Sequence, residues 1–535
     1  MKAAQKSKLA LSIIAVGSVA VTLGCRQEMP VAFESNLVHS YKYELTKDLP
    51  MDQVVSDTDW ALERLFGTPD EPRLPELDGQ DFSELVSLER LQQAAGPIPA
   101  EAIPTIENPN PETVASYRQH CANCHGITGN GRGPTGTALN PYPRDYRMGV
   151  YKFKSTTRGS KPTREDLAGL IRHGIGGTSM NPIPGLTEDG VQALVDYVIY
   201  LSWRGEVERQ MIDVAMFELD LQGGDRIIRP ELAGLVDEEI EELSDEESEL
   251  LDAFVEQIDE AFPEELSSLV KAEHPQADQD KLAELVEQRE DELTTSDEQQ
   301  LREKIAKRIG TEAQRALRER QQKLEQRELF LENWGYIEDS VAEVAASWLD
   351  AEDEVTEIAD RGEIPVPEDR VAFEAMMAGP EAETLTASVQ RGQELFLSET
   401  VGCAKCHGKS GQGDGQTEDY DDWTKDWTVN VGLDPKKTDQ LVPLLARGAL
   451  TPHNIRPRNF AEGVFRGGSQ PDDLYRRIAN GIAGTPMPAA PVIEGVFERQ
   501  DIWHLINYIR SLDTSAEEMT LASTSSVEAS GESAP

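Results

Sequence analysis

Two short cysteine motifs carry the clearest chemistry in this sequence. Residues 121–125 read CANCH and residues 403–407 read CAKCH, so both follow the pattern CxxCH. Two intervening residues let both thiols reach the two vinyl groups of one porphyrin, and the adjoining histidine then lies beneath the iron. The spacing predicts two covalently bound c-type haems. Their predicted protein partners are the thioether cysteines Cys121, Cys124, Cys403 and Cys406, and the iron ligands His125 and His407.

Other uses of paired cysteines fit the pattern less well. A thioredoxin-like motif would sit in a βαβ pattern, and none is visible around either pair. A structural zinc site needs four ligands, whereas these two pairs are far apart and each is followed at once by histidine. A disulfide framework would use varied spacings. Covalent haem attachment therefore remains the prediction.

An internal repeat follows each motif. Residues 143–151 (PRDYRMGVY) match residues 457–465 (PRNFAEGVF), and an Asp-Leu pair follows at 166–167 and at 473–474. The repeat closes with GIGGTSM at 174–180 and GIAGTPM at 481–487. Such a repeat indicates a duplicated unit. Apolar spacing predicts helices at 111–120 and 391–396 before the motifs, and at 191–201 and 501–512 after them.

The order of these elements resembles that of small His/Met cytochrome c domains. The resemblance covers two stretches of roughly 100–130 residues and implies a compact all-α fold for each. It also implies Met180 and Met487 as the second axial ligands, whose soft thioethers favour Fe(II). In the first copy, residues 129–134 (GNGRGP) resemble the loop whose carbonyl receives the N–H of the iron-bound histidine.

Three histidines compete with the methionines as ligands. His120 directly precedes the first cysteine and cannot readily reach the opposite haem face. His173 has a non-ligand, Asn480, at its place in the second copy, and His453 has no counterpart in the first copy. The methionines therefore remain the predicted ligands. Because Ser179 and Asn181 replace the two prolines that flank the second methionine, we expect a looser first loop.

Two arginines occupy equivalent places in the repeat. Arg144 and Arg458 are predicted to contact haem propionates, since a guanidinium matches a carboxylate through two hydrogen bonds. A solvated loop arginine is the other interpretation, and the sequence leaves both open. The connection after the motif is longer in the second copy, at 408–457 against 126–143. Its Trp423 and Trp427 either shield a haem edge or pack within the loop.

The N-terminus has the form of an export signal. Lys2, Lys6 and Lys8 precede a mostly apolar run over residues 9–24, which is shorter than the ~20 residues of a spanning helix. Cys25 follows Leu-Gly and resembles the lipidated cysteine of bacterial lipoproteins. An uncleaved signal anchor, or an ordinary signal with a chance cysteine, is the alternative. We expect an exported chain on the periplasmic face of a bacterial membrane, anchored by lipid.

Length and charge limit the remaining possibilities. The chain has 535 residues, enough for three or four structural units. With 51 Lys and Arg against 98 Asp and Glu, the net charge is −47, which argues against nucleic acid as a partner. The predicted fold class is mainly α, with two small all-α cytochrome c domains joined by a long acidic helical spacer. The predicted units are a signal peptide (1–24), an acidic, proline-rich tether partly wrapped on the first haem domain (25–105), cytochrome c domain 1 (106–206), the spacer (207–382), cytochrome c domain 2 (383–514) and a disordered tail (515–535).

These features predict a membrane-anchored dihaem cytochrome that carries single electrons in a respiratory chain. Its expected partners are a redox protein donor and acceptor, with respiratory complexes the favoured class. A locally basic loop at 132–158 predicts an acidic partner or the membrane surface for the first domain. The alternatives are a dihaem peroxidase-type enzyme, which needs an open iron site, and the haem subunit of a larger dehydrogenase or quinol-oxidising complex.

Overall fold

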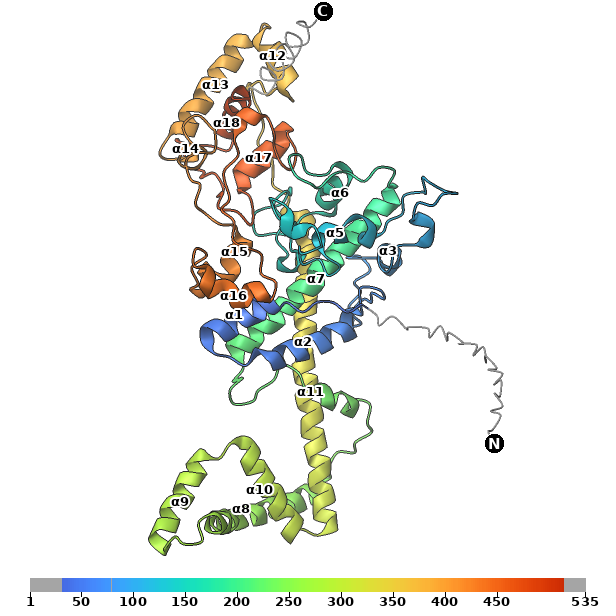
Figure 1. The fold of residues 1–535 in the computed structure, drawn as a ribbon, viewed down its shortest axis with the longest axis vertical. Coiled ribbons are helices and arrows are strands. Elements are labelled where there is room, and N and C mark those ends of the chain that lie inside the picture. The colour runs from blue at the N-terminus through green and yellow to red at the C-terminus, as the bar shows by residue number, and fades with distance from the viewer. Residues whose placement is uncertain (1–30, 78, 514–535) are drawn as a thin grey trace, which may run out of the picture.

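The computed structural model describes residues 31–77 and 79–513 (Figure 1). Within these ranges the chain is helical, and β pairing is limited to isolated bridges, so the predicted mainly-α class is confirmed. No helix in these ranges has the length and apolar character needed to cross a membrane. The predicted signal peptide, Cys25 and the predicted tail lie outside the described residues.

A long central helix organises the first half of the molecule. Helix α7 (Glu188–Glu218) is buried on nearly all sides along its N-terminal part, as expected for its continuous apolar sequence. The short helices α4 (Tyr117–His120) and α5 (Ala122–His125), and α6 (Arg164–His173), lie beside it. We call residues 31–228 the first domain. The predicted helix at 191–201 is confirmed, but the one predicted at 111–120 is wrong before Tyr117, because residues 111–116 are irregular.

The segment predicted as a tether is folded onto this domain from residue 31. It forms α1 (Leu37–Lys47), α2 (Met51–Phe66) and α3 (Leu88–Ala94). Met51, Leu62 and Phe66 are fully buried in one core with Trp203 of α7. Apolar burial of this size stabilises the domain, so this part of the chain is structural and not a simple linker.

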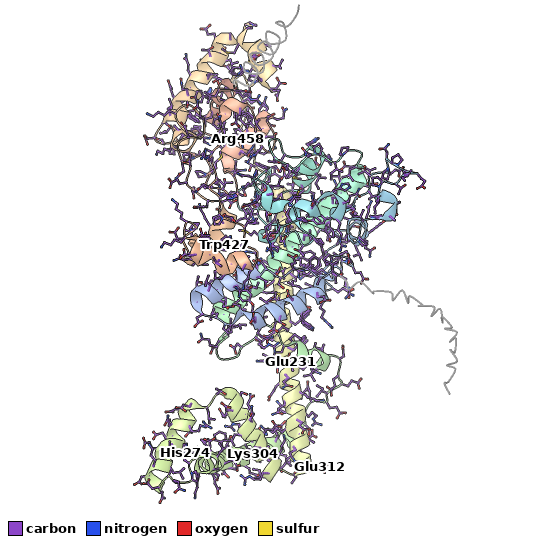
Figure 2. The ribbon with its side chains drawn as sticks, in the orientation of Figure 1. Glu231, His274, Lys304, Glu312, Trp427 and Arg458 are labelled. Carbon is purple, nitrogen blue, oxygen red and sulfur yellow. The ribbon has the colours of Figure 1, made fainter. Side chains whose placement is uncertain are left out.

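The predicted spacer divides into parts with different roles, the last of which (351–382) belongs to the second domain described below. Its first residues continue α7 into the first domain. Next, α8 (Asp245–Glu273), α9 (Gln279–Glu292) and α10 (Thr295–Ile309) form an arm around a core that includes Phe254, Ile258 and Ile305. Helix α11 (Glu312–Leu349) connects the arm to the first domain, where Trp348 is buried (Figure 1). Figure 2 shows His274 and Lys304 in this arm and Glu312 at the start of α11, all at the opposite end of the molecule from Arg458.

The second domain (residues 351–513) has a smaller core of its own. It contains α12 (Arg370–Met377), α13 (Ala382–Leu397), α14 (Cys403–His407), α17 (Pro471–Asn480) and α18 (Asp501–Ser511). The predicted helix at 501–512 is thus confirmed. Helices α13 and α18 cross at Gly392, where any Cβ would clash with the carbonyl of His504. Ile358 and Ile364, from the end of the predicted spacer, pack against this core.

The long connection of the second copy forms a small lobe on the first domain. We call residues 419–456 the insertion. It contains α15 (Asp422–Trp427) and α16 (Thr438–Ala446), and it packs Trp427, Leu441 and Leu444 against Val38 and Tyr41 of α1. The two domains therefore contact one another directly, although many residues separate them in sequence.

Candidate haem sites

Each CxxCH motif forms one short helical turn. Helix α5 begins directly after Cys121, and α14 begins at Cys403, so each turn places both thiols and the histidine within reach of one porphyrin. All four cysteines are free in the structure. Burial raises the pKa of Cys121 to about 12 and that of Cys403 to about 11, so these thiols stay protonated at neutral pH.

Both motif histidines are oriented by a backbone carbonyl from the repeat. Nδ1 of His125 lies 3.1 Å from the carbonyl of Arg144, and Nδ1 of His407 lies 3.2 Å from the carbonyl of Arg458. Because a carbonyl only accepts, Nδ1 carries the proton and Nε2 keeps its lone pair for a metal. Burial lowers the pKa of His125 to about 4 and also lowers that of His407, which favours the neutral ring that binds iron.

This arrangement corrects the role expected for the glycine-rich loop. The accepting carbonyl belongs to the repeated arginine and not to residues 129–134. The loop instead holds the motif's backbone, since Gly131 donates to the carbonyl of His125 and Gly413 donates to that of His407. Both glycines have positive φ, and a Cβ on Gly131 would lie 2.8 Å from the carbonyl oxygen of Pro143. The repeated Pro-Arg pair was noted in the sequence for its guanidinium, whereas the role of its backbone carbonyl was missed.

An aromatic ring from the repeat stacks on each motif histidine. The ring centroids of His125 and Tyr146 are 4.8 Å apart, and those of His407 and Phe460 are 4.6 Å apart. The planes are within 20° of parallel in both cases. The repeat thus supplies both the hydrogen bond and the flat contact that fix each imidazole plane.

The loops that end at Met180 and Met487 (residues 174–180 and 481–487), which we call the methionine loops, share one hydrogen-bonding pattern. Their preceding helices, α6 and α17, each start with a capping box whose aspartate comes from the repeated Asp-Leu pair. Each helix then ends at a glycine with positive φ, where a Cβ would clash with the carbonyl of the methionine.

Within each loop, the threonine hydroxyl accepts from the methionine N–H. The distance from N to Oγ1 is 3.1 Å for Met180 and 3.2 Å for Met487. The carbonyl of each methionine accepts in turn from the isoleucine at the start of the loop, Ile175 or Ile482. Ser179 in place of a proline does not change this pattern, so the hydrogen bonds give no sign of the looser first loop that we expected.

The competing histidines are held elsewhere. Nε2 of His120 lies 2.9 Å from the carbonyl of Val114. His173 is exposed on α6. His453 is also exposed, and its ring stacks on that of Tyr142 with the centroids 4.8 Å apart. None of these three histidines therefore takes part in the repeated contacts described above around His125 and His407.

The two repeated arginines differ in their side-chain partners. The guanidinium of Arg144 lies 3.5 Å from the centre of the Trp423 ring, and burial lowers its pKa to about 10, so it remains charged at neutral pH. Nη1 of Arg458 lies 3.4 Å from a carboxylate oxygen of Glu462. A contact with a haem propionate stays a prediction for both residues.

The donor set fits covalent haem at both positions. Each position offers two free thiols, an imidazole oriented through Nδ1, and a methionine in a braced loop. Haem, when bound, supplies an iron that cycles between Fe(II) and Fe(III). The protein's part is to hold the imidazole plane, present the thioether and shield the site from water.

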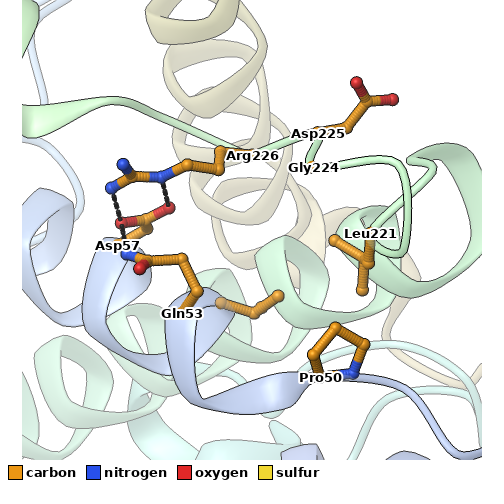
Figure 3. A pocket seen from close by; sticks show the side chains of 8 residues that line it. Pro50, Gln53, Asp57, Leu221, Gly224, Asp225 and Arg226 are labelled. Atoms are coloured by element: carbon orange, nitrogen blue, oxygen red, sulfur yellow. Dashed lines mark hydrogen bonds and ion pairs between the residues drawn. The ribbon is translucent and has the colours of Figure 1, made fainter. Parts of the chain in front are cut away.

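A separate cavity of about 240 Å³ lies between α2 and the segment after α7 (Figure 3). Pro50 and Leu221 line its apolar side, and Asp57 pairs with Arg226 through two hydrogen bonds at its edge. Because this buried ion pair has both partners satisfied, we assign the cavity no chemistry.

Comparison with known proteins supports the assignment of both motifs. Residues 389–513 match the family model described as cytochrome c, and residues 110–198 match that of the cbb3-type cytochrome c oxidase subunit III. Curated proteins give no significant match. Among solved structures, the chain resembles one from the reducing HAO-like protein complex of Kuenenia stuttgartiensis, at 18% identity over 74% of this chain and 93% of that one. Its TM-score of 0.34 is too low to support an argument.

Both matched stretches contain a CxxCH motif followed by its methionine loop. The four motif cysteines thus attach two haems, one in each domain. The chain is a c-type cytochrome with two haem-binding domains, and its chemistry is electron transfer.

Proposed function

We propose that this protein carries single electrons between redox partners at the periplasmic face of a bacterial membrane, as part of a respiratory chain. The observation that carries the proposal is the repeated frame in which each imidazole has a matching methionine loop. An iron with two protein ligands exchanges electrons without forming or breaking a bond to substrate. We assign His125 and Met180 to the first iron, and His407 and Met487 to the second.

The packing of the two domains supports a single two-haem unit. Asp426 of the insertion lies 3.2 Å from Nζ of Lys42 in α1 and 2.8 Å from a guanidinium nitrogen of Arg209 in α7. The indole N–H of Trp423 also donates to the carbonyl of Asp145 at 3.3 Å. Contacts of this kind fix the two haem domains against each other, which favours electron exchange within the chain.

An optical redox titration of the purified protein tests the ligands. If both irons have His/Met ligation, the oxidised protein shows the weak far-red absorption of methionine-bound ferric haem, and both haems are low spin. A resting protein with one high-spin haem would contradict the carrier proposal. That result would favour the peroxidase-type enzyme, whose reaction needs an open iron site.

We also propose that Cys25 carries the lipid that attaches the exported chain to the membrane. A diacylglycerol thioether contributes two acyl chains, each stabilising attachment by ~0.8 kcal/mol per buried CH₂. The variant Cys25→Ser should keep both haems but leave the membrane fraction. Retention of this variant in salt-washed membranes would contradict the lipid anchor without affecting the assignment of the haem sites.

The partner proposed for the first domain needs revision. Arg144, Lys152 and Arg158 of its basic loop face Trp423, Asp421 and the second methionine loop. These side chains therefore serve the contact between domains and are not free for an acidic partner. With a net charge of −47, the chain as a whole favours partners that present basic surfaces.

A further inference from the structure

The methionine loop of each domain is contacted by an arginine of the other domain. Arg158, in the first domain, donates from Nη1 to the carbonyl of Met487 at 2.5 Å and from Nη2 to the carbonyl of Thr485 at 2.7 Å. In the opposite direction, Nη2 of Arg466 lies 3.3 Å from the carbonyl of Gly177. A Cβ on Gly177 would lie 2.9 Å from Cγ1 of Val464, so the first loop also touches the second domain.

The two contacts differ in strength. Arg158 donates two short hydrogen bonds to the methionine loop of the second domain. One of them goes to the carbonyl of the proposed ligand, Met487. Arg466 makes one longer bond, three residues before Met180. Because charge-assisted hydrogen bonds shorten as they strengthen, the first domain holds the second loop more firmly than the reverse.

The segment that carries Arg158 is itself held in place. Nζ of Lys154 donates to the carbonyls of Thr157 and Arg158, and the N–H of Thr157 donates to the carbonyl of Glu354 at 3.0 Å. Asn480, at the end of α17, donates to the carbonyl of Thr156 at 3.1 Å. The guanidinium therefore approaches the second loop from a fixed position and not from a free surface chain.

We propose that Arg158 is a positioning residue through which the first domain sets the methionine ligation and the reduction potential of the second haem. The two bonds restrain the backbone on both sides of Pro486 and so keep the Met487 thioether directed at the iron. The guanidinium charge favours the less positive Fe(II) state, which raises the potential. This proposal rests on the assignment of Met487 as an iron ligand.

The test compares Arg158→Gln and Arg158→Lys with the unaltered full-length holoprotein. Arg158→Gln removes the charge and the paired bonds, so we expect loss of part of the far-red absorption and a lower potential for one haem only. Arg158→Lys keeps the charge and can make one bond, so we expect a smaller change in the same haem. Arg172→Gln is the matched control, because Arg172 lies on the surface of α6 and pairs with Glu165 and Glu188 of its own domain.

Met487→Ala identifies which potential belongs to the second haem. If this variant shows the same far-red absorption as the unaltered protein, Met487 is not an iron ligand. The positioning role proposed for Arg158 then has no basis. If Met487→Ala behaves as expected but Arg158→Gln changes neither the absorption nor the second potential, the positioning role alone is overturned. Equal shifts of both haems, or the same shift in Arg172→Gln, would also overturn it, since they indicate a general charge effect. Should Arg158→Gln fail to assemble with haem, the potential of Arg158→Lys decides between these outcomes.

Discussion

The two haem domains share an inner frame but differ in what surrounds it. In both, an arginine carbonyl holds the motif histidine, an aromatic ring stacks on it, and a threonine braces the methionine loop. The first frame is set against a large core that includes α1, α2, α3, α7 and part of α11, whereas the second has a small core of its own. The comparison shows that short repeated motifs fix the ligand geometry, while distant parts of the chain provide its support.

Removing one pair of thioether cysteines gives the largest expected effect on this comparison. Cys121→Ala with Cys124→Ala should leave one covalent haem, and so should Cys403→Ala with Cys406→Ala. Because the first domain has an extensive core without haem, it should stay folded when its haem is missing. The second domain should lose much of its helical structure, since its core is smaller.

Haem content per chain and far-UV circular dichroism measure both effects. The two double variants serve as controls for one another, because each removes the same chemical groups. Equal losses of helical structure would show that the surrounding core does not distinguish the domains.

Removing one methionine sulfur gives the next largest effect. Met180→Ala and Met487→Ala should each remove roughly half of the far-red absorption and lower one potential, because a soft ligand that favours Fe(II) is lost. Since the loops have matching hydrogen bonds, the two losses should be similar in size. Spectra and potentials of both variants test this, and a loss confined to one of them would show that the loops are not equivalent.

The repeated frame was largely predictable from sequence, because its parts lie close together along the chain. The spacing of the CxxCH motifs and the shared pattern G-I-x-G-T-x-M identified the residues that the structure brings into matching places. The role of the repeated Pro-Arg pair was only half understood. The sequence predicted a role for the guanidinium of Arg144. In the structure, the backbone carbonyl of Arg144 accepts the hydrogen bond from His125, and its side chain stacks on Trp423.

The packing between distant segments could not be predicted in the same way. Composition suggested a tether and a spacer, because both regions are rich in charge. Yet a few apolar residues in each, such as Phe66 and Trp348, are buried in the core of the first domain. Likewise, the contact of Arg158 with Met487 joins residues 329 positions apart, and no local pattern reports such a contact.

Breaking the ion-pair network around Asp426 tests whether the insertion fixes the two domains together. Burial alone would raise the pKa of Asp426, but Arg209, His39 and Lys42 hold it below its ordinary value. Asp426→Asn leaves Lys42 and Arg209 buried without this counter-charge, which should lower the free energy of unfolding by about 3 kcal/mol at pH 7.

The pH dependence of this variant gives a second check. A carboxylate whose folded pKa is depressed stabilises the fold above its unfolded pKa of about 3.9, and that contribution is lost as the pH falls through the folded value. The difference between the two proteins in chemical denaturation should therefore stay constant from pH 7 to about 5 and shrink below about 4. Glu418→Gln, which removes an exposed pair with Lys436 in the same region, should change little. An equal effect of both variants would argue against a fixing role for the network.

The smallest expected effect concerns one of the sequence differences between the methionine loops. Ser179 stands where the second loop has Pro486, and the hydrogen bonds around them match. Proline in a compatible conformation stabilises a fold by about 0.5 kcal/mol, because it restricts the unfolded chain. Ser179→Pro should therefore raise the denaturant concentration at which Met180 leaves its iron, and Pro486→Ser should lower that for Met487. The far-red absorption followed during denaturation reports both. If Ser179→Pro instead weakens the first site, the two loops have different backbones in solution, and the matching frame does not extend to the residue beside the ligand.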